Sequence, residues 1–234
     1  MHFHWLPSIS LLLSAVTYAS PAANTPTQVN LRIEGAQRTI FEGSVVTTAH
    51  NVTTSLGGTH KCDGTNEGAN SSPGPTTTAA LDDTGKQHGF LFDGLFISQF
   101  DDFIISTIAG ESADSISNIW ISGVNFFPQD IFTGCKQEVK AGDNIVFALV
   151  SVSGPDPLFL KLLGPTTARV NQAVTFTVVE GTFLTPIKGA VVNGKTTDAN
   201  GKVAITFTQT GVNSAKADLP GSVRSNRVDV QVTN

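Results

Sequence analysis

The chain has 234 residues, of which 40% are hydrophobic and 14% are charged. So few charges argue against a disordered polypeptide, and the polar content is too high for a membrane protein. The net charge of −5 and the lack of any Lys/Arg run argue against nucleic acid or an anionic membrane as a partner. The 22 glycines and 11 prolines favour short strands and turns over long helices.

The N-terminus is typical of a signal peptide. Residues 9–16 form an apolar run that is too short to span a bilayer, and small residues precede Ser20 at the usual cleavage spacing. We therefore predict a signal peptide over residues 1–19 and a polar spacer over 20–27. The region before the apolar run has His2 and His4 but no Lys or Arg, so a buried N-terminal strand is the alternative. The expected location is secreted, either extracellular or cell-wall associated.

Cys62 and Cys135 are the two cysteines of the chain. In a secreted protein they most simply form one disulfide, and two separate buried thiols are the alternative. A bond that closes this loop of 73 residues stabilises the fold by about 4 kcal/mol in the chain-entropy model.

The first mature segment predicts paired strands followed by a long connection. Residues 28–34 alternate apolar and polar side chains, which indicates a half-buried strand, and residues 39–48 form the return strand. Residues 50–75 are rich in Gly, Asn, Ser and Thr, and we predict a long exposed loop that Cys62 anchors. Asn51 and Asn70 each begin a triplet with the form of an N-glycosylation site.

A single short helix is predicted over residues 76–85, because Pro75 precedes it and Gly85 ends it. Strands are predicted on both sides of a hairpin turn at Asp93-Gly94 and then over residues 118–127 and 145–150. The first domain, residues 28–152, is therefore predicted to be α+β, with a mostly antiparallel sheet and one short helix.

A Ser/Gly/Pro-rich segment, residues 151–156, is the predicted domain boundary. The composition then shifts from Phe to Val, Thr and Ala, and short strands are separated by turns such as Asn193-Gly194 and Asn200-Gly201. This regular spacing predicts an all-β sandwich over residues 158–234. Six segments carry the predicted strands, namely 158–163, 173–179, 190–192, 203–208, 214–219 and 228–232.

Five stretches between residues 29 and 150 resemble a secreted family, a domain of unknown function related to the C-terminal β-domain of transcobalamin. The most specific is Gly57-Gly58-Thr59-His60-Lys61-Cys62-Asp63-Gly64-Thr65-Asn66; the others are residues 78–83, 100–105, 119–125 and 134–143. The family pairs its two cysteines, which implies a Cys62–Cys135 bond here. Transcobalamin also uses a large helical barrel to enclose cobalamin, and this sequence has no such wall, so we do not expect cobalamin binding.

Residues 189–202 resemble bacterial-type immunoglobulin-like repeats of secreted proteins. The resemblance implies an immunoglobulin-like sandwich, and it specifies a fold rather than an activity. Asp198 and Asn200 in this segment look like part of a calcium loop, but the further ligands of such a loop are missing. We interpret the segment as a tight turn.

The sequence does not contain a catalytic pattern that we can assign. No Gly-x-Ser-x-Gly elbow occurs, and a disulfide would remove the thiolate that His60 could activate at Cys62. Asp82-Asp83 is interpreted as a solvated helix end and Asp101-Asp102 as a strand cap, because adjacent residues on a strand point to opposite faces. We expect no enzyme activity, no cofactor and no metal.

Aromatic residues are the candidates for ligand contact. Trp120 and the Phe-rich core could include an exposed stacking surface, and Phe126 and Phe127 cannot both face one core if they lie on a strand. With His60 in the Cys62 loop, these residues are the candidate contacts. The predicted function is a secreted, non-enzymatic binding or surface-interaction protein, with an extracellular ligand such as a carbohydrate or a cell-wall component. A structural wall or matrix component and an enzyme with an unrecognised site are the alternatives.

Overall fold

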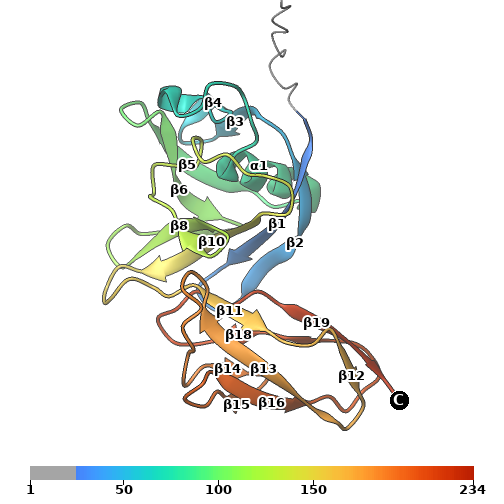
Figure 1. The fold of residues 1–234 in the computed structure, drawn as a ribbon. Coiled ribbons are helices and arrows are strands. Elements are labelled where there is room, and N and C mark those ends of the chain that lie inside the picture. The colour runs from blue at the N-terminus through green and yellow to red at the C-terminus, as the bar shows by residue number, and fades with distance from the viewer. Residues whose placement is uncertain (1–24) are drawn as a thin grey trace, which may run out of the picture.

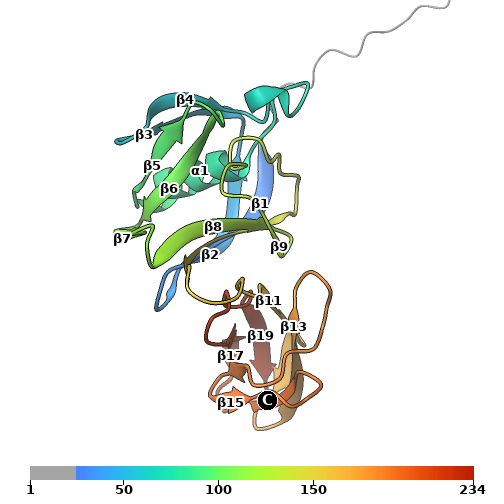
Figure 2. The same ribbon diagram turned by 90° about the vertical axis from the view of Figure 1, so that its left-hand side faces the viewer.

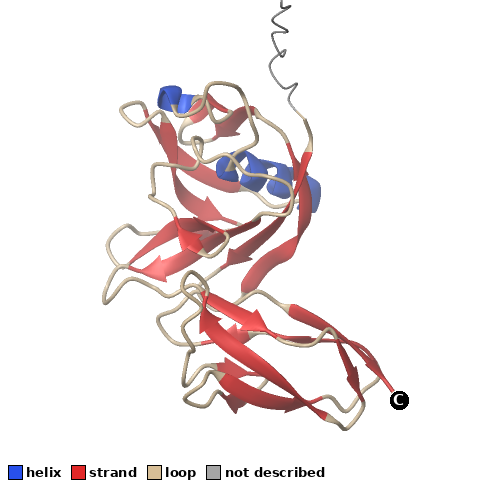
Figure 3. Cartoon of the chain, viewed as in Figure 1, coloured by secondary structure: helices blue, strands red, loops and turns tan. Residues whose placement is uncertain are grey.

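The computed structural model describes residues 25–234. The predicted signal peptide and most of the spacer lie outside the described residues. The described chain is mostly β, arranged in several sheets, with one α-helix in this range (Figure 3). Figure 1 shows two bodies, which we call the N-terminal lobe (residues 27–151, blue to yellow) and the C-terminal lobe (residues 158–233, orange to red).

A five-stranded sheet forms the base of the N-terminal lobe, in the order β2-β1-β10-β8-β9. Its strands are β1 (Thr27–Glu34), β2 (Thr39–Thr47), β8 (Asn118–Val124), β9 (Phe127–Pro128) and β10 (Asn144–Ser151). β1 and β10 pair in parallel, and the other neighbours pair antiparallel. The parallel pair brings the first and last strands of this lobe together in the middle of the sheet.

Two smaller sheets and a helix cover the inner face of this sheet. They are β3 (His50–Thr54) with β4 (Gly58–Cys62), β5 (Phe92–Ile97) with β6 (Asp102–Ile108) and β7 (Glu111–Ser112), and α1 (Thr77–His88), preceded by a short 3-10 turn at Asn66–Gly68. Val29, Leu31 and Ile33 of β1 lie in the core between these layers. Figure 1 shows α1 between the β3–β4 hairpin and the base sheet.

α1 is longer than the sequence predicted. Thr76 caps its start, with the side chain 3.2 Å from the Ala79 N–H, and Gly89 ends it at a φ of 75°. Gly85, the predicted end, lies inside the helix. A Cβ at Gly85 would lie 2.8 Å from the Phe90 carbonyl oxygen, so this glycine allows a close approach of backbone rather than a turn.

Two further predictions, a long loop and a hairpin turn, are wrong because both segments lie in strands. Residues 50–62, predicted as part of a long loop, form the β3–β4 hairpin, in which Val52 and Thr54 point inward. Asp93-Gly94, predicted as a hairpin turn, lies within β5 at a bulge. A Cβ at Gly94 would lie 2.7 Å from the Ile104 carbonyl oxygen, so the glycine again serves close strand packing.

The Cys62–Cys135 disulfide is confirmed. It joins the end of β4 to the segment that follows β9, and both sulfurs are buried. The Gly64 N–H donates to the Cys135 carbonyl oxygen at 3.0 Å, so the backbone is also tied at this point. The bond therefore anchors the hairpin to the segment that follows β9.

Three small sheets make up the C-terminal lobe. They are β11 (Leu160–Leu163), β13 (Ala173–Glu180) and β16 (Lys202–Thr206); β12 (Thr167–Arg169), β19 (Val228–Thr233) and β17 (Gly211–Ala215); and β15 (Lys195–Thr196), β14 (Val191–Val192) and β18 (Ala217–Asp218). Each of the six segments predicted as strands overlaps an observed strand. Their apolar side chains form a core of their own around Phe176 and Val178.

The outer face of the base sheet packs on the C-terminal lobe (Figure 2). Five residues from both lobes form this junction core, namely Phe126, Val146, Ala148, Phe159 and Val223. The prediction of a half-buried β1 is therefore wrong at its C-terminal end. Arg32 and Glu34 point away from the first core, but the second lobe covers them, and they are only 6% and 2% exposed.

Candidate functional site

An ionic network crosses the junction and centres on Glu34. One carboxylate oxygen of Glu34 lies 2.6 Å from Lys216 Nζ, and the other lies 2.7 Å from Arg224 Nε and 2.9 Å from the Thr39 hydroxyl. Lys216 and Arg224 belong to the C-terminal lobe. Because one carboxylate has about four acceptor positions, these three donors occupy most of what Glu34 can offer.

Arg32 is the cation that this network leaves without a full partner. Its Nε lies 3.3 Å from Glu34, as an ion pair without hydrogen-bond geometry, and the guanidinium donates no hydrogen bond to any residue between 25 and 234. Burial lowers the pKa of Arg32, against the opposing effect of Glu34 and Glu42. An arginine still keeps its proton in proteins, so a charged guanidinium lies here with its buried Nε–H unsatisfied.

Phe126 lies beside this cation in a strained turn. Asn125 and Phe126 form the two-residue connection between β8 and β9, with φ angles of 52° and 69°. Such turns favour Asn-Gly, and a bulky residue in the second position costs about 1 to 3 kcal/mol. The ring lies 5.9 Å from the Arg32 guanidinium carbon and 5.1 Å from Lys161 Nζ, so two cations share one aromatic ring.

The C-terminal lobe holds Phe126 in this position. The Thr182 hydroxyl donates to the Phe126 carbonyl oxygen at 2.9 Å. A Cβ at Gly181 would lie 2.3 Å from the Phe126 Cβ, so only glycine fits there. The strained turn is thus fixed from the opposite lobe.

Arg32, Lys161 and Phe126 line a pocket of about 420 Å³ between the lobes. Its size is within the range typical of small-molecule sites. The remaining lining residues come from β1, β2 and β10 on one side and from β11 and β19 with its preceding loop on the other: Asn30, Leu31, Glu42, Gly43, Ser44, Asn144, Ile145, Val146, Leu162, Leu163, Asn226, Arg227 and Asp229.

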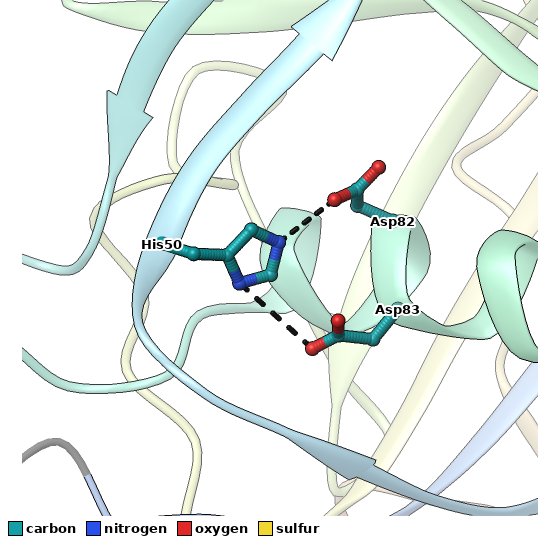
Figure 4. Close-up of side chains that lie close together, drawn as sticks. All are labelled: His50, Asp82 and Asp83. Atoms are coloured by element: carbon teal, nitrogen blue, oxygen red, sulfur yellow. Dashed lines mark hydrogen bonds and ion pairs between the residues drawn. The ribbon is translucent and has the colours of Figure 1, made fainter.

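A second cluster of titratable groups lies away from this pocket, between β3 and α1. His50 points toward the helix and meets Asp82 and Asp83 (Figure 4). His50 Nε2 is 2.7 Å from Asp82, and Nδ1 is 2.8 Å from the Thr48 carbonyl oxygen and 3.9 Å from Asp83. Asp82 also accepts from Lys86 at 2.5 Å. The solvated helix end predicted at Asp82 is wrong, since Asp82 is buried.

This cluster has the geometry of an ion-paired clamp. Both ring nitrogens of His50 face oxygen acceptors, so the imidazolium form satisfies them together. The hydrogen bond to Asp82 raises the pKa of His50 above 6.5. Burial alone would raise the pKa of Asp82, but the hydrogen bonds from His50 and Lys86 lower it below 3.8. One ligand atom from each of His50, Asp82 and Asp83 lies within 4.8 Å of the others, but neither His50 nitrogen is left to bind a metal or activate a nucleophile while both donate.

Asp102 is a third perturbed group, and it is fully buried. Burial raises its pKa to about 7, although the N–H groups of Phe103 and Cys135 donate to it. The strand-cap interpretation of Asp102 fits these hydrogen bonds, but they also tie it to the disulfide. Asp102 therefore supports the backbone around Cys135 rather than facing a cavity for substrate.

The predicted ligand contacts lie in different places. Trp120 is buried in the first core and donates its indole N–H to the Glu111 carbonyl oxygen at 3.2 Å. His60 stacks on Phe96 with ring centroids 3.5 Å apart. Phe127 is 58% exposed beside the junction. Of the four predicted contact residues, only Phe126 lines the pocket.

The two predicted glycosylation residues differ in their surroundings. Asn51 is exposed on β3. The side-chain amide of Asn70 donates to the carbonyl oxygens of Gly64 at 2.7 Å and Lys136 at 3.0 Å. A glycan on Asn70 would replace one of these two amide hydrogens, so Asn51 is the more accessible of the two acceptors.

Comparison with known proteins did not identify a family for this chain. Neither models of protein families nor curated proteins gave a match to the chain. Among residues 25–234, no helix is long and apolar enough to cross a membrane.

Sequence reasoning singled out Phe126 but missed the cations around it. Arg32 alternates with apolar residues and so had the pattern of a solvent-exposed side chain. Lys161 follows the lobe boundary with no motif around it. The signal that could have found the site is the unusual Asn125-Phe126 pair where a hairpin normally has Asn-Gly.

Proposed function

We propose that this chain is a secreted, non-enzymatic binding protein whose ligand lies in the pocket that Arg32, Phe126 and Lys161 line between the two lobes. The observation that carries the proposal is a buried Arg32, whose Nε–H has no hydrogen-bond partner, beside a strained Phe126, in a pocket lined from both lobes. Backbone strain and unsatisfied buried donors are both costly, and they concentrate at functional sites.

We further infer the finer fold from the sequence patterns. Residues 28–152 are assigned to an α+β domain like the C-terminal domain of transcobalamin, and residues 158–234 to an immunoglobulin-like sandwich. One helix packed among mostly antiparallel sheets supports the first assignment, and small sheets around a separate core support the second. The disulfide supports an oxidising, extracellular location.

A binding role is favoured over catalysis because the perturbed groups are already satisfied. His50 and Asp82 bond to each other, and Asp102 bonds to backbone. None of these three side chains lines the pocket between the lobes. A structural wall or matrix component remains the second candidate, and exposed apolar side chains such as Phe183, at 82%, favour it as sites of self-association.

The test is a saturable binding screen of the full chain against glycans and small molecules. The variant Leu163→Trp places a larger ring at the pocket edge, where Leu163 is 42% exposed. The control is Leu91→Trp, at a site that is 86% exposed and outside the pocket. We expect Leu163→Trp to weaken a screened ligand about tenfold or more and Leu91→Trp to leave its affinity unchanged.

Equal binding by both variants would place the ligand elsewhere and overturn the proposed site. A screen without any saturable ligand, combined with concentration-dependent self-association, would favour the structural component. Turnover of a screened compound that is lost in Leu163→Trp would favour the enzyme.

A further inference from the structure

We infer that the ligand of the pocket is a small, hydroxyl-bearing organic anion, whose carboxylate or phosphate group binds Arg32. This inference rests on the proposed function and adds the chemical class of the ligand. It is argued from the charges of the pocket, from the geometry of its donors and from its neutral polar groups.

The first step is the uneven pairing of charges around the pocket. Glu42, on the rim, lies 2.6 Å from Lys216, and Asp229 lies 2.9 Å from Arg227 Nε. Both rim acids therefore already have cationic partners. Lys161 forms no ion pair with any residue of the described chain, and Arg32 has only the long contact to Glu34.

The second step is the cost of burying Arg32 with only a long ion pair and no hydrogen bond from its Nε. Arg32 is 6% exposed, and a buried charge is strongly destabilising unless it is paired and hydrogen-bonded. An anion in the pocket would supply the missing acceptors. The guanidinium fork matches two oxygens of a carboxylate or phosphate, and Lys161 would add a second positive charge at the same ring.

The third step concerns the rest of the ligand. Asn30, Ser44 and Asn144 bring neutral amide and hydroxyl groups to the pocket wall, which suit hydroxyl groups rather than further charges. A volume of about 420 Å³ holds a ligand of about one or two sugar rings.

The test is calorimetric titration of the full chain with three probes of matched shape. D-glucuronate carries a carboxylate, D-glucose 6-phosphate carries a phosphate, and D-glucose carries neither. We expect at least one of the two anions to bind saturably, D-glucose to bind about tenfold or more weakly, and the affinity for the anion to fall as salt is raised.

Charge variants complete the test. Arg32→Gln should weaken the bound anion by about tenfold to a hundredfold, and Lys161→Gln by about two- to fivefold. Lys188→Gln, at an exposed lysine outside the pocket, is the matched control and should change nothing. If Arg32→Gln does not fold, the anion affinity of Lys161→Gln and the salt dependence of binding still test the inference.

Equal affinity for D-glucose and both anions would overturn the inference, as would binding that neither charge variant weakens. Failure of both anions to bind at millimolar concentration would overturn it too. If a ligand from the screen is nonetheless blocked by Leu163→Trp, the pocket remains a binding site and only the anionic class is wrong.

Discussion

At the scale of single residues, His50 holds its proton through contacts on both sides of the ring. Its pKa in the folded protein is higher than 6.5, so folding favours the charged form. The stability from this group is present in full below about pH 6.5 and is lost as the pH rises through the folded pKa. Asp82 has a lowered pKa, so its contribution is present above 3.8 and is lost as the pH falls below that value.

We therefore predict that His50→Gln lowers the free energy of unfolding by about 1 to 2 kcal/mol at pH 5 and by less at pH 9. Urea denaturation at the two pH values measures this. The matched control is His88→Gln, at an exposed histidine, which should cost less stability at pH 5 than His50→Gln. A loss of stability for His50→Gln that is equal at both pH values would contradict a charged His50 that pairs with Asp82.

Asp102 gives a second pH dependence, in which folding favours the neutral form of the side chain rather than the charged form. Its pKa rises from 3.8 to about 7 on folding, so the unfolded chain ionises first as the pH increases. The free energy of unfolding should then fall between about pH 4 and 7, by at most about 1.4 kcal/mol per pH unit. Asp102→Asn keeps an oxygen acceptor for the Cys135 N–H and should flatten this slope. A slope in denaturation curves that the variant does not change would be evidence against a protonated Asp102.

At the scale of elements, the disulfide holds the β3–β4 hairpin in place. The hairpin is short, and its residues 50–62 have the Gly- and Thr-rich composition of a loop. We predict that the double variant Cys62→Ala, Cys135→Ala loses about 4 kcal/mol of unfolding free energy, since the bond closes a loop of 73 residues. Chemical denaturation measures the loss. A decrease below about 1 kcal/mol would mean that packing around the hairpin, not the bond, holds it.

The elements that could be predicted are those with a local pattern. Alternating apolar residues indicated β1, regularly spaced turn residues indicated the strands of the C-terminal lobe, and the cap at Thr76 lies next to the Pro75 that marked the helix start. The misplaced turns at Gly85 and Gly94 share a cause. The sequence alone does not distinguish a glycine that allows close packing from a glycine that forms a turn. Only the position of the neighbouring backbone in the structure separates the two.

At the scale of the whole molecule, the junction between the lobes depends on Glu34. We predict that Glu34→Gln lowers the free energy of unfolding by about 3 to 5 kcal/mol, because Lys216 and Arg224 lose their shared buried carboxylate. The matched control is Glu67→Gln, whose ion pair with Lys136 is 45% exposed at the glutamate and should cost under about 1 kcal/mol. Calorimetry measures both, and equal effects would contradict a junction held by Glu34.

The site could be predicted only in part, because it is made by the meeting of the lobes. Phe126 was found from two adjacent aromatic residues. Arg32 and Glu34 were assigned to solvent, since the Phe126 ring beside Arg32 is 94 residues away in the chain, and Lys216 and Arg224 are 182 and 190 residues from Glu34. No short-range pattern links Arg32 to Lys161, so their shared contact with one ring appears only in three dimensions.

A crystal structure of the full chain soaked with D-glucuronate and D-glucose 6-phosphate in turn tests the central claim most directly. We predict electron density for at least one anion in the pocket between the lobes, with its charged group within hydrogen-bond distance of the Arg32 guanidinium and near Lys161. Density for the anions only at other surfaces, or an unchanged pocket at millimolar ligand, would contradict the account.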